Sequence, residues 1–84
     1  MMDDDALRAL ILRKMLMHRW IGGKHTAIDN LPKGFPPGVR NDVSQVVEVL
    51  IREGFIVRKP INYREQVYLS PKRVYEAKKI VGMV

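Results

Sequence analysis

The sequence contains no cysteine, which excludes disulfide bonds and any zinc or iron–sulfur site that depends on cysteine ligands. Its only imidazoles are those of His18 and His25, so we expect no transition-metal site built from protein side chains. No apolar run approaches the roughly 18 residues that a helix needs to cross a bilayer. The glycine-rich phosphate and dinucleotide motifs are also missing, as is any set of nucleophile, base and acid. We therefore expect neither a cofactor nor an enzymatic activity.

Acidic residues are few compared with basic ones, 9 against 15, and the formal net charge is +6. Such an excess predicts a polyanionic partner, which is DNA, RNA or an anionic membrane. We favour a nucleic acid and expect no membrane partner. The excess lies in residues 33–84, which carry ten basic and five acidic side chains. A length of 84 residues with 46% hydrophobic residues predicts one globular domain over residues 1–84.

The first helix is predicted over residues 6–19, a run without glycine or proline that follows three aspartates. These aspartates offer an N-cap and suit the positive end of the helix dipole. An acidic start also differs from the basic start of a secretory signal, so we expect a cytoplasmic protein. One broad apolar face is predicted to contain Leu7, Leu10, Ile11, Met15 and Met17, with Leu12 and Leu16 outside it.

A helix that is apolar nearly all round is buried on more than one side, and in a small domain the second side can belong to another subunit. The C-terminal helix also carries more apolar residues than one core needs. The sequence therefore predicts a homodimer built from the first and last helices. The expected contact residues are Leu12, Leu16, Ile80 and Val84.

A break, a short helix and a rigid turn are predicted between residues 21 and 38. Gly22 and Gly23 stop the first helix, and His25 is expected to be a turn residue. Thr26 and Asp29 match a capping box for a short helix over residues 27–31. The stretch "NLPKGFPPG" holds three prolines and two glycines and cannot be helical throughout. Its Phe35 is expected to anchor the turn to the core.

The next helix is predicted over residues 37–53, because Val39, Val43, Val46, Val47 and Leu50 recur at helical spacing. Rotation by about 100° per residue puts Asn41, Gln45, Glu48 and Arg52 on the opposite side, with Ser44 and Arg40 near its edge. Gly54 is expected to end this helix. The period then changes, and residues 55–61 and 66–71 read as two strands joined by the polar tip "NYRE". A last helix is predicted over residues 71–81.

This order of helix, helix, helix, strand, strand, helix resembles the winged helix-turn-helix DNA-binding proteins, particularly the small archaeal ones. The resemblance covers about residues 5–81, and the stretch "LIREGFIVRKPINYREQVYLSP" carries it most clearly. It implies an α+β, mostly helical domain with three helices, a two-stranded wing hairpin and a C-terminal helix. The turn "LPKGFPPG" departs from the family, because it is longer and richer in proline than the usual turn between the two helices.

The resemblance also implies a function, which is sequence-specific binding of double-stranded DNA by a small transcriptional regulator. The helix over residues 37–53 would enter the major groove, and the wing over residues 55–70 would lie on the backbone or in the minor groove. Carried over by position, the expected base readers are Arg40, Asn41, Ser44 and Gln45. The expected phosphate contacts are Lys33, Arg52, Arg58, Lys59 and Arg64. Two alternatives stay open: a winged-helix module for protein–protein interaction within a larger complex, and a winged helix that binds RNA.

Overall fold

A computed structural model describes residues 3–62 and 64–84 of the chain. Its α-helices are α1 (Asp4–His18), α2 (Arg40–Arg52) and α3 (Val74–Val81), and its strands are β1 (Thr26–Ala27), β2 (Ile56–Ile61) and β3 (Arg64–Leu69). Three short 3-10 turns precede or connect these elements: η1 (Ile28–Asn30), η2 (Pro37–Val39) and η3 (Pro71–Arg73). The predicted α+β class is confirmed.

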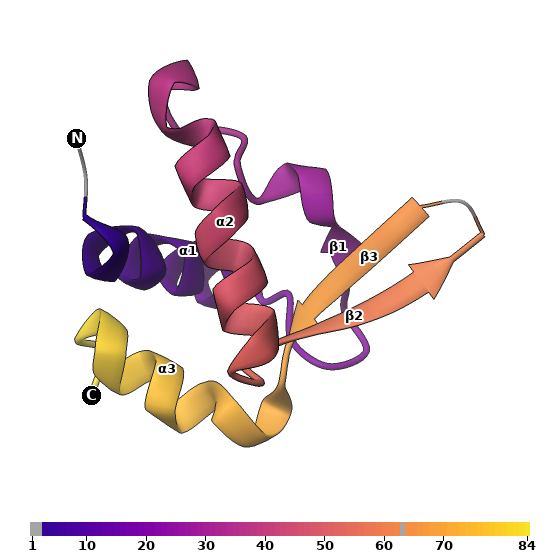
Figure 1. The fold of residues 1–84 in the computed structure, drawn as a ribbon. Helices are drawn as coiled ribbons and strands as arrows, with labels where there is room; N and C mark the ends of the chain where they lie inside the picture. The colour runs from indigo at the N-terminus through magenta and orange to yellow at the C-terminus, as the bar shows by residue number, and fades with distance from the viewer. Residues whose placement is uncertain (1–2, 63) are drawn as a thin grey trace.

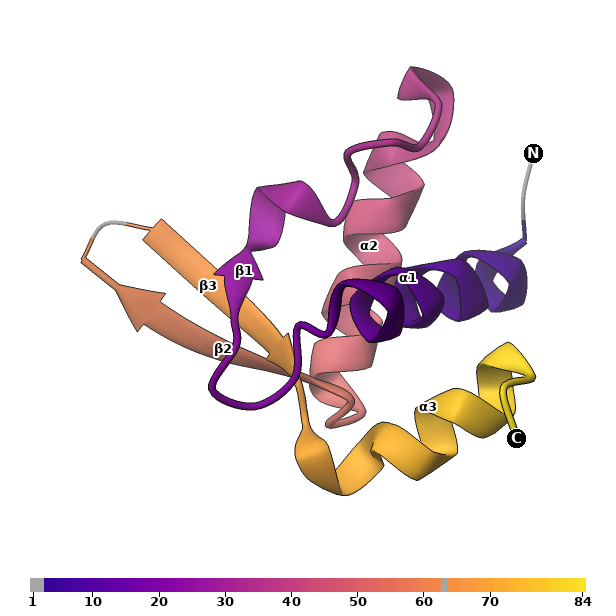
Figure 2. The ribbon, with the colours of Figure 1, turned by 180° about the vertical axis from the view of Figure 1, so that it is seen from behind.

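The three helices gather at one end of the molecule, and the β2–β3 hairpin projects from the other (Figure 1). Seen from the first side, α2 lies in front of α1; from behind, α1 lies in front of α2 (Figure 2). Both chain ends lie on the side away from the hairpin tip (Figure 1). The tip of the hairpin therefore lies away from both termini (Figure 1).

The predicted two-stranded hairpin is part of a three-stranded antiparallel sheet with the order β1-β3-β2. The hairpin register runs from Ile56 opposite Leu69 to Ile61 opposite Arg64. β3 begins two residues earlier than predicted, so Arg64 lies in a strand and the tip is shorter than "NYRE". Tyr63 of the predicted tip lies outside the described residues.

The capping box predicted at Thr26 is wrong. Thr26 is 7% exposed and pairs with Val67 of β3, and the residue before the 3-10 turn η1 is Ala27, which makes no side-chain cap. The Thr26 hydroxyl instead accepts a hydrogen bond from the Asn30 side-chain amide at 2.9 Å. The short helix over residues 27–31 is thus reduced to one 3-10 turn, because pairing with β3 overrides the local helix-start pattern.

The predicted apolar face of α1 is confirmed at Leu7, Ile11 and Met15, which are buried, and is wrong at four other positions. Leu12 and Leu16 are 0% and 8% exposed, whereas Leu10 and Met17 are 37% and 62% exposed. The reason is that α1 contacts α2, α3 and β3 together, so its buried side covers a wide arc. The core also contains Val43, Val46, Val47 and Leu50 of α2, Phe55 and Ile56, and Val67 and Leu69 of β3.

The helix predicted over residues 37–53 is confirmed as a 3-10 turn that leads into α2. Gly54 ends it with a φ of +85°, a left-handed conformation that glycine adopts at little cost. The backbone amide of Phe55 then bonds back to the Leu50 carbonyl at 3.0 Å, and the chain enters β2 directly. This sharp end places the hairpin beside α2. The predicted last helix is confirmed as η3 followed by α3.

Candidate nucleic-acid interface

The outward strip of α2 is the first part of the candidate site. Val43, Val46, Val47 and Leu50 are buried, and Asn41, Ser44, Gln45, Glu48 and Arg52 are exposed, as the helical period predicts. The strip combines amides, which can pair with adenine, and an arginine, which can pair with guanine or phosphate. Four of the nine predicted nucleic-acid contacts, Arg40, Asn41, Ser44 and Gln45, lie at or near its N-terminal end.

Arg40 has a structural contact as well as an exposed position. Its Nε donates to the carbonyl oxygen of Phe35 at 3.0 Å, which ties the start of α2 to the proline-rich turn. The guanidinium Nη groups have no protein partner within the part of the chain that the structure describes. Arg40 therefore fixes the turn and still presents donors beside Asn41.

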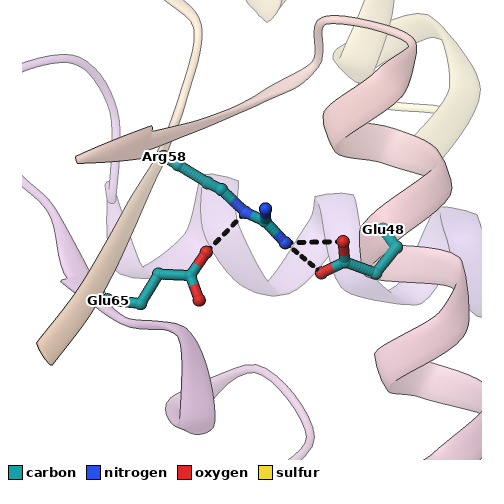
Figure 3. A network of polar contacts seen from close by, with 3 residues as sticks. All are labelled: Glu48, Arg58 and Glu65. Carbon is teal, nitrogen blue, oxygen red and sulfur yellow. Dashed lines mark hydrogen bonds and ion pairs between the residues drawn. The ribbon is translucent and has the colours of Figure 1, made fainter. Parts of the chain in front are cut away.

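A charge network joins α2 to both strands of the hairpin (Figure 3). Arg58 of β2 directs its Nη2 to both carboxylate oxygens of Glu48 on α2, each at 2.5 Å, and its Nε to Glu65 of β3. All three side chains are roughly half-exposed. The network links helix and hairpin, and it surrounds one positive charge with two negative ones. Arg58 was predicted to meet phosphate, but the structure places it in internal ion pairs.

The hairpin register explains why Arg58 points toward α2 while its basic neighbours do not. Residues directly opposite in an antiparallel pair share a face, and faces alternate along each strand. Arg58 is opposite Val67, whose side chain lies in the core. Lys59 is opposite Gln66, on the other face of the sheet. Oε1 of Gln66 in turn accepts a hydrogen bond at 3.2 Å from Nδ1 of His25, which lies in the loop directly before β1.

Lys33 and Arg64 are distant in sequence and line the same cleft. The cleft measures about 570 Å³ and lies between η1 and the hairpin, with Asp29, Asn30 and Glu65 among its other lining residues. Lys33 and Arg64 are both exposed, and neither forms an ion pair within residues 3–62 and 64–84. The fold thus brings two of the predicted phosphate contacts together at one cleft beside η1.

Lys14 is a positioning residue that the sequence pattern did not reveal. Its ammonium group donates to the carbonyl oxygens of Asn30 at 2.7 Å, of Leu31 at 3.3 Å and of Lys33. Burial lowers the pKa of Lys14, and the positive charge of Lys33 lowers this pKa further. Lys14 holds the turn that carries Lys33 and leads into α2. Only the tertiary contact between α1 and the turn identifies this role.

Two further arginines serve the fold away from the candidate site. The guanidinium carbons of Arg8 and Arg73 lie 5.2 and 4.4 Å from the centre of the Phe55 ring. Arg8 also pairs with Glu53 at 3.0 Å, and Arg73 lies 3.1 Å from Glu76. These contacts join α1, the end of α2 and η3. The predicted nucleic-acid contacts that are exposed cations and form no ion pair among the described residues are Lys33, Arg40, Arg52, Lys59 and Arg64.

The four residues expected at a dimer contact differ in their exposure. Leu12 and Leu16 are buried within one chain and are not accessible to a partner. Ile80 is half-buried against the core, and Val84 is 67% exposed. The surplus of apolar residues on α1 that motivated the dimer is largely taken up by packing within the chain.

Comparisons with models of protein families, with curated proteins and with solved structures find no match for this chain. Among the described residues, no helix combines the length and the apolar character that crossing a membrane requires.

Proposed function

We propose that the protein binds double-stranded DNA in a sequence-specific manner, with α2 in the major groove and the β2–β3 hairpin alongside, and that it serves as a small transcriptional regulator in the cytoplasm. The observation that carries the proposal is the exposed polar strip of α2 next to a hairpin that the same helix holds through Arg58. The order of the elements is compatible with a winged helix-turn-helix domain. A helix of about 10–12 Å in diameter fits a major groove about 12 Å wide.

The proposed roles follow from position. Asn41, Ser44 and Gln45 read base edges from the exposed strip, and Arg40 joins them at the start of the helix. Arg52 meets a phosphate at the other end of α2, and Lys33 and Arg64 meet phosphates across the cleft that they line. Arg58 links α2 to the hairpin through its ion pairs with Glu48 and Glu65. Lys59 lies on the face of the hairpin that the register gives to Arg64 as well, opposite to the face of Arg58, and it meets a phosphate there.

Glu48 and Glu65 act as selective elements in this proposal. Two carboxylates around one guanidinium leave a net negative charge in the middle of an otherwise basic surface. Phosphates are repelled from that point and are held by cations at the rim. This distribution weakens indiscriminate binding and favours a position in which the duplex is centred over α2.

A two-fold homodimer remains part of the proposal, with the exposed Val84 and the half-buried Ile80 as the accessible residues of the expected contact. A dimer would present two copies of α2 to half-sites about one helical turn apart.

The experiment that tests the function is an electrophoretic-shift assay with genomic fragments, in the presence and absence of competitor DNA. A fragment that stays bound at a competitor excess supports sequence-specific binding. Selection from a random duplex pool then defines the site. Binding that competitor abolishes for every fragment, or no binding at low salt, contradicts the proposal. The same assay with a duplex RNA and a single-stranded RNA tests the RNA alternative.

A further inference from the structure

A groove of about 580 Å³ lies between α1 and the proline-rich turn, and it adjoins the proposed DNA surface at Lys33, which lines both. Its apolar lining comes from Leu10 and Met17 of α1 and from Phe35 and Pro36 of the turn. Leu10 and Met17 are 37% and 62% exposed, so the core does not use much of their surface. Both walls, α1 and the segment between η1 and η2, are seen in Figure 2, where α1 lies in front of α2.

The α1 wall of the groove has the spacing of a helix-binding surface. Leu10, Arg13, Lys14 and Met17 occupy positions i, i+3, i+4 and i+7, which form one face over two turns. Seven residues of helix rise about 10.5 Å. The opposite wall, with Phe35 and Pro36, is held at its base by the bonds from Lys14 to the Asn30 and Leu31 carbonyls. The groove therefore fits a partner helix whose apolar residues recur at the same i, i+3 and i+7 spacing.

The charge of the lining defines the chemistry of the occupant. Every ionisable residue of the lining is basic: Arg13, Lys14 and Lys33. Arg13 and Lys33 are exposed and form no ion pair among the described residues. An apolar floor with a cationic rim is complementary to an amphipathic helix that carries carboxylates beside its apolar strip.

A second copy of this chain is a poor occupant. Two copies of α1 that packed antiparallel over residues 10–17 would place Arg13 and Lys14, near the middle of that stretch, against their own symmetry mates. Like charges directly opposite destabilise such a contact. We propose that the groove docks an acidic amphipathic helix of another protein. This function goes beyond DNA binding and uses a surface that shares Lys33 with the proposed DNA surface.

The test uses three synthetic helical peptides labelled with fluorescein and a titration followed by fluorescence anisotropy. The first carries leucines at i, i+3 and i+7 with glutamates beside them, the second has the same composition with the leucines in a shuffled order, and the third has lysines in place of the glutamates. We expect the first peptide to bind at least about tenfold more tightly than the other two, which corresponds to about 1.4 kcal/mol. Equal binding of all three peptides, or no binding, overturns the proposal.

Protein variants locate the contact. Arg13→Glu should weaken binding of the glutamate peptide by about tenfold or more. Lys79→Glu makes the same charge change on α3, which lies on the other side of α1 from the proline-rich turn, and should change the affinity little (Figure 1). Equal losses in both variants would show attraction by net charge alone and would reject the groove.

Amide chemical-shift mapping with the glutamate peptide separates this inference from the proposed DNA binding. Shifts at Leu10, Arg13, Met17 and Phe35 support the groove, and shifts confined to α2 and the hairpin reject it in favour of an acidic peptide that mimics DNA. Peptide bound in the groove should also remain bound when a duplex is added. Failure of every DNA-binding assay leaves this result intact, because none of the four mapped residues belongs to the proposed DNA surface.

Discussion

The substitution Glu48→Gln tests the charge network between α2 and the hairpin. Removal of Arg58 is a poor test, because its loss leaves two unpaired carboxylates and weakens DNA binding whether or not Arg58 contacts phosphate. Replacing Glu48 instead removes one negative charge from the centre of the surface and leaves Arg58 paired with Glu65. The Arg58 guanidinium then has an unengaged nitrogen on the side of α2, and we expect it to gain a phosphate contact.

The expected magnitude follows from the exposure of the pair. The side chains of Arg58 and Glu48 are 44% and 47% exposed, so loss of their ion pair should cost no more than about 1 kcal/mol of unfolding free energy. One additional phosphate contact steepens the salt dependence of log K by about 0.9. Between about 200 mM and 50 mM salt, the ratio of variant to wild-type affinity for random duplex DNA should therefore rise about 3.5-fold.

The assay is a salt titration of duplex binding by fluorescence anisotropy, with Glu76→Gln as the matched control. Glu76 on α3 also faces an arginine, and its replacement changes the net charge by the same amount. We expect the control to leave the salt slope unchanged. Identical slopes for Glu48→Gln and Glu76→Gln would refute the placement of Glu48 at the DNA surface.

The remaining predictions concern other residues of the site and the fold. Arg64→Ala should weaken binding to all duplexes and reduce the salt slope by about one unit, and an unchanged slope would exclude a phosphate contact. Asn41→Ala or Gln45→Ala should cost about 1–3 kcal/mol on a selected site and little on random DNA, whereas equal losses would show that neither residue reads bases. Lys14→Met should lower the unfolding free energy by about 1–2 kcal/mol in chemical denaturation, because it removes the donor to three carbonyl oxygens, and no loss would contradict that role. Because the pKa of Lys14 is lowered in the folded state, the unfolded chain binds more protons than the folded chain at pH values between that pKa and 10.5. In this interval Lys14 therefore makes the wild-type unfolding free energy increase with pH. The Lys14→Met variant should lack this increase. Sedimentation equilibrium should give about twice 9.7 kDa for the predicted homodimer, and a mass near 9.7 kDa would reject it.

Local patterns in the sequence predicted α2 and its exposed strip well. The buried valines of α2 repeat at helical spacing, and Gly54 ends the helix where the backbone needs a positive φ. The residues that end α2 and the change from helical to strand spacing are close together in the sequence. Both features could therefore be predicted without knowing which elements pack against α2. The same holds for the acidic N-cap of α1, where Asp3 accepts from the Ala6 amide at 2.7 Å.

Features that depend on the packing of distant segments could not be predicted in this way. β1 has two residues and forms because β3 offers a free edge, and the same residues also fit a helix-start pattern. The buried side of α1 depends on where α3 packs against it, and this position cannot be read from the sequence of α1 alone. The ion pairs of Arg58 depend on the hairpin register and on the angle to α2. The contacts of Lys14 depend on the course of the proline-rich turn.

Amide chemical-shift mapping of the uniformly labelled protein with a selected duplex tests the central claim most directly. We predict that the largest shifts fall on Asn41, Gln45 and Arg52 of α2 and on Arg64 of the hairpin, and that the buried side of α1 and the amides of α3 change little. Shifts confined to α1 and α3, or no shift at a duplex concentration that saturates the electrophoretic assay, would contradict the proposal that α2 and the hairpin bind DNA.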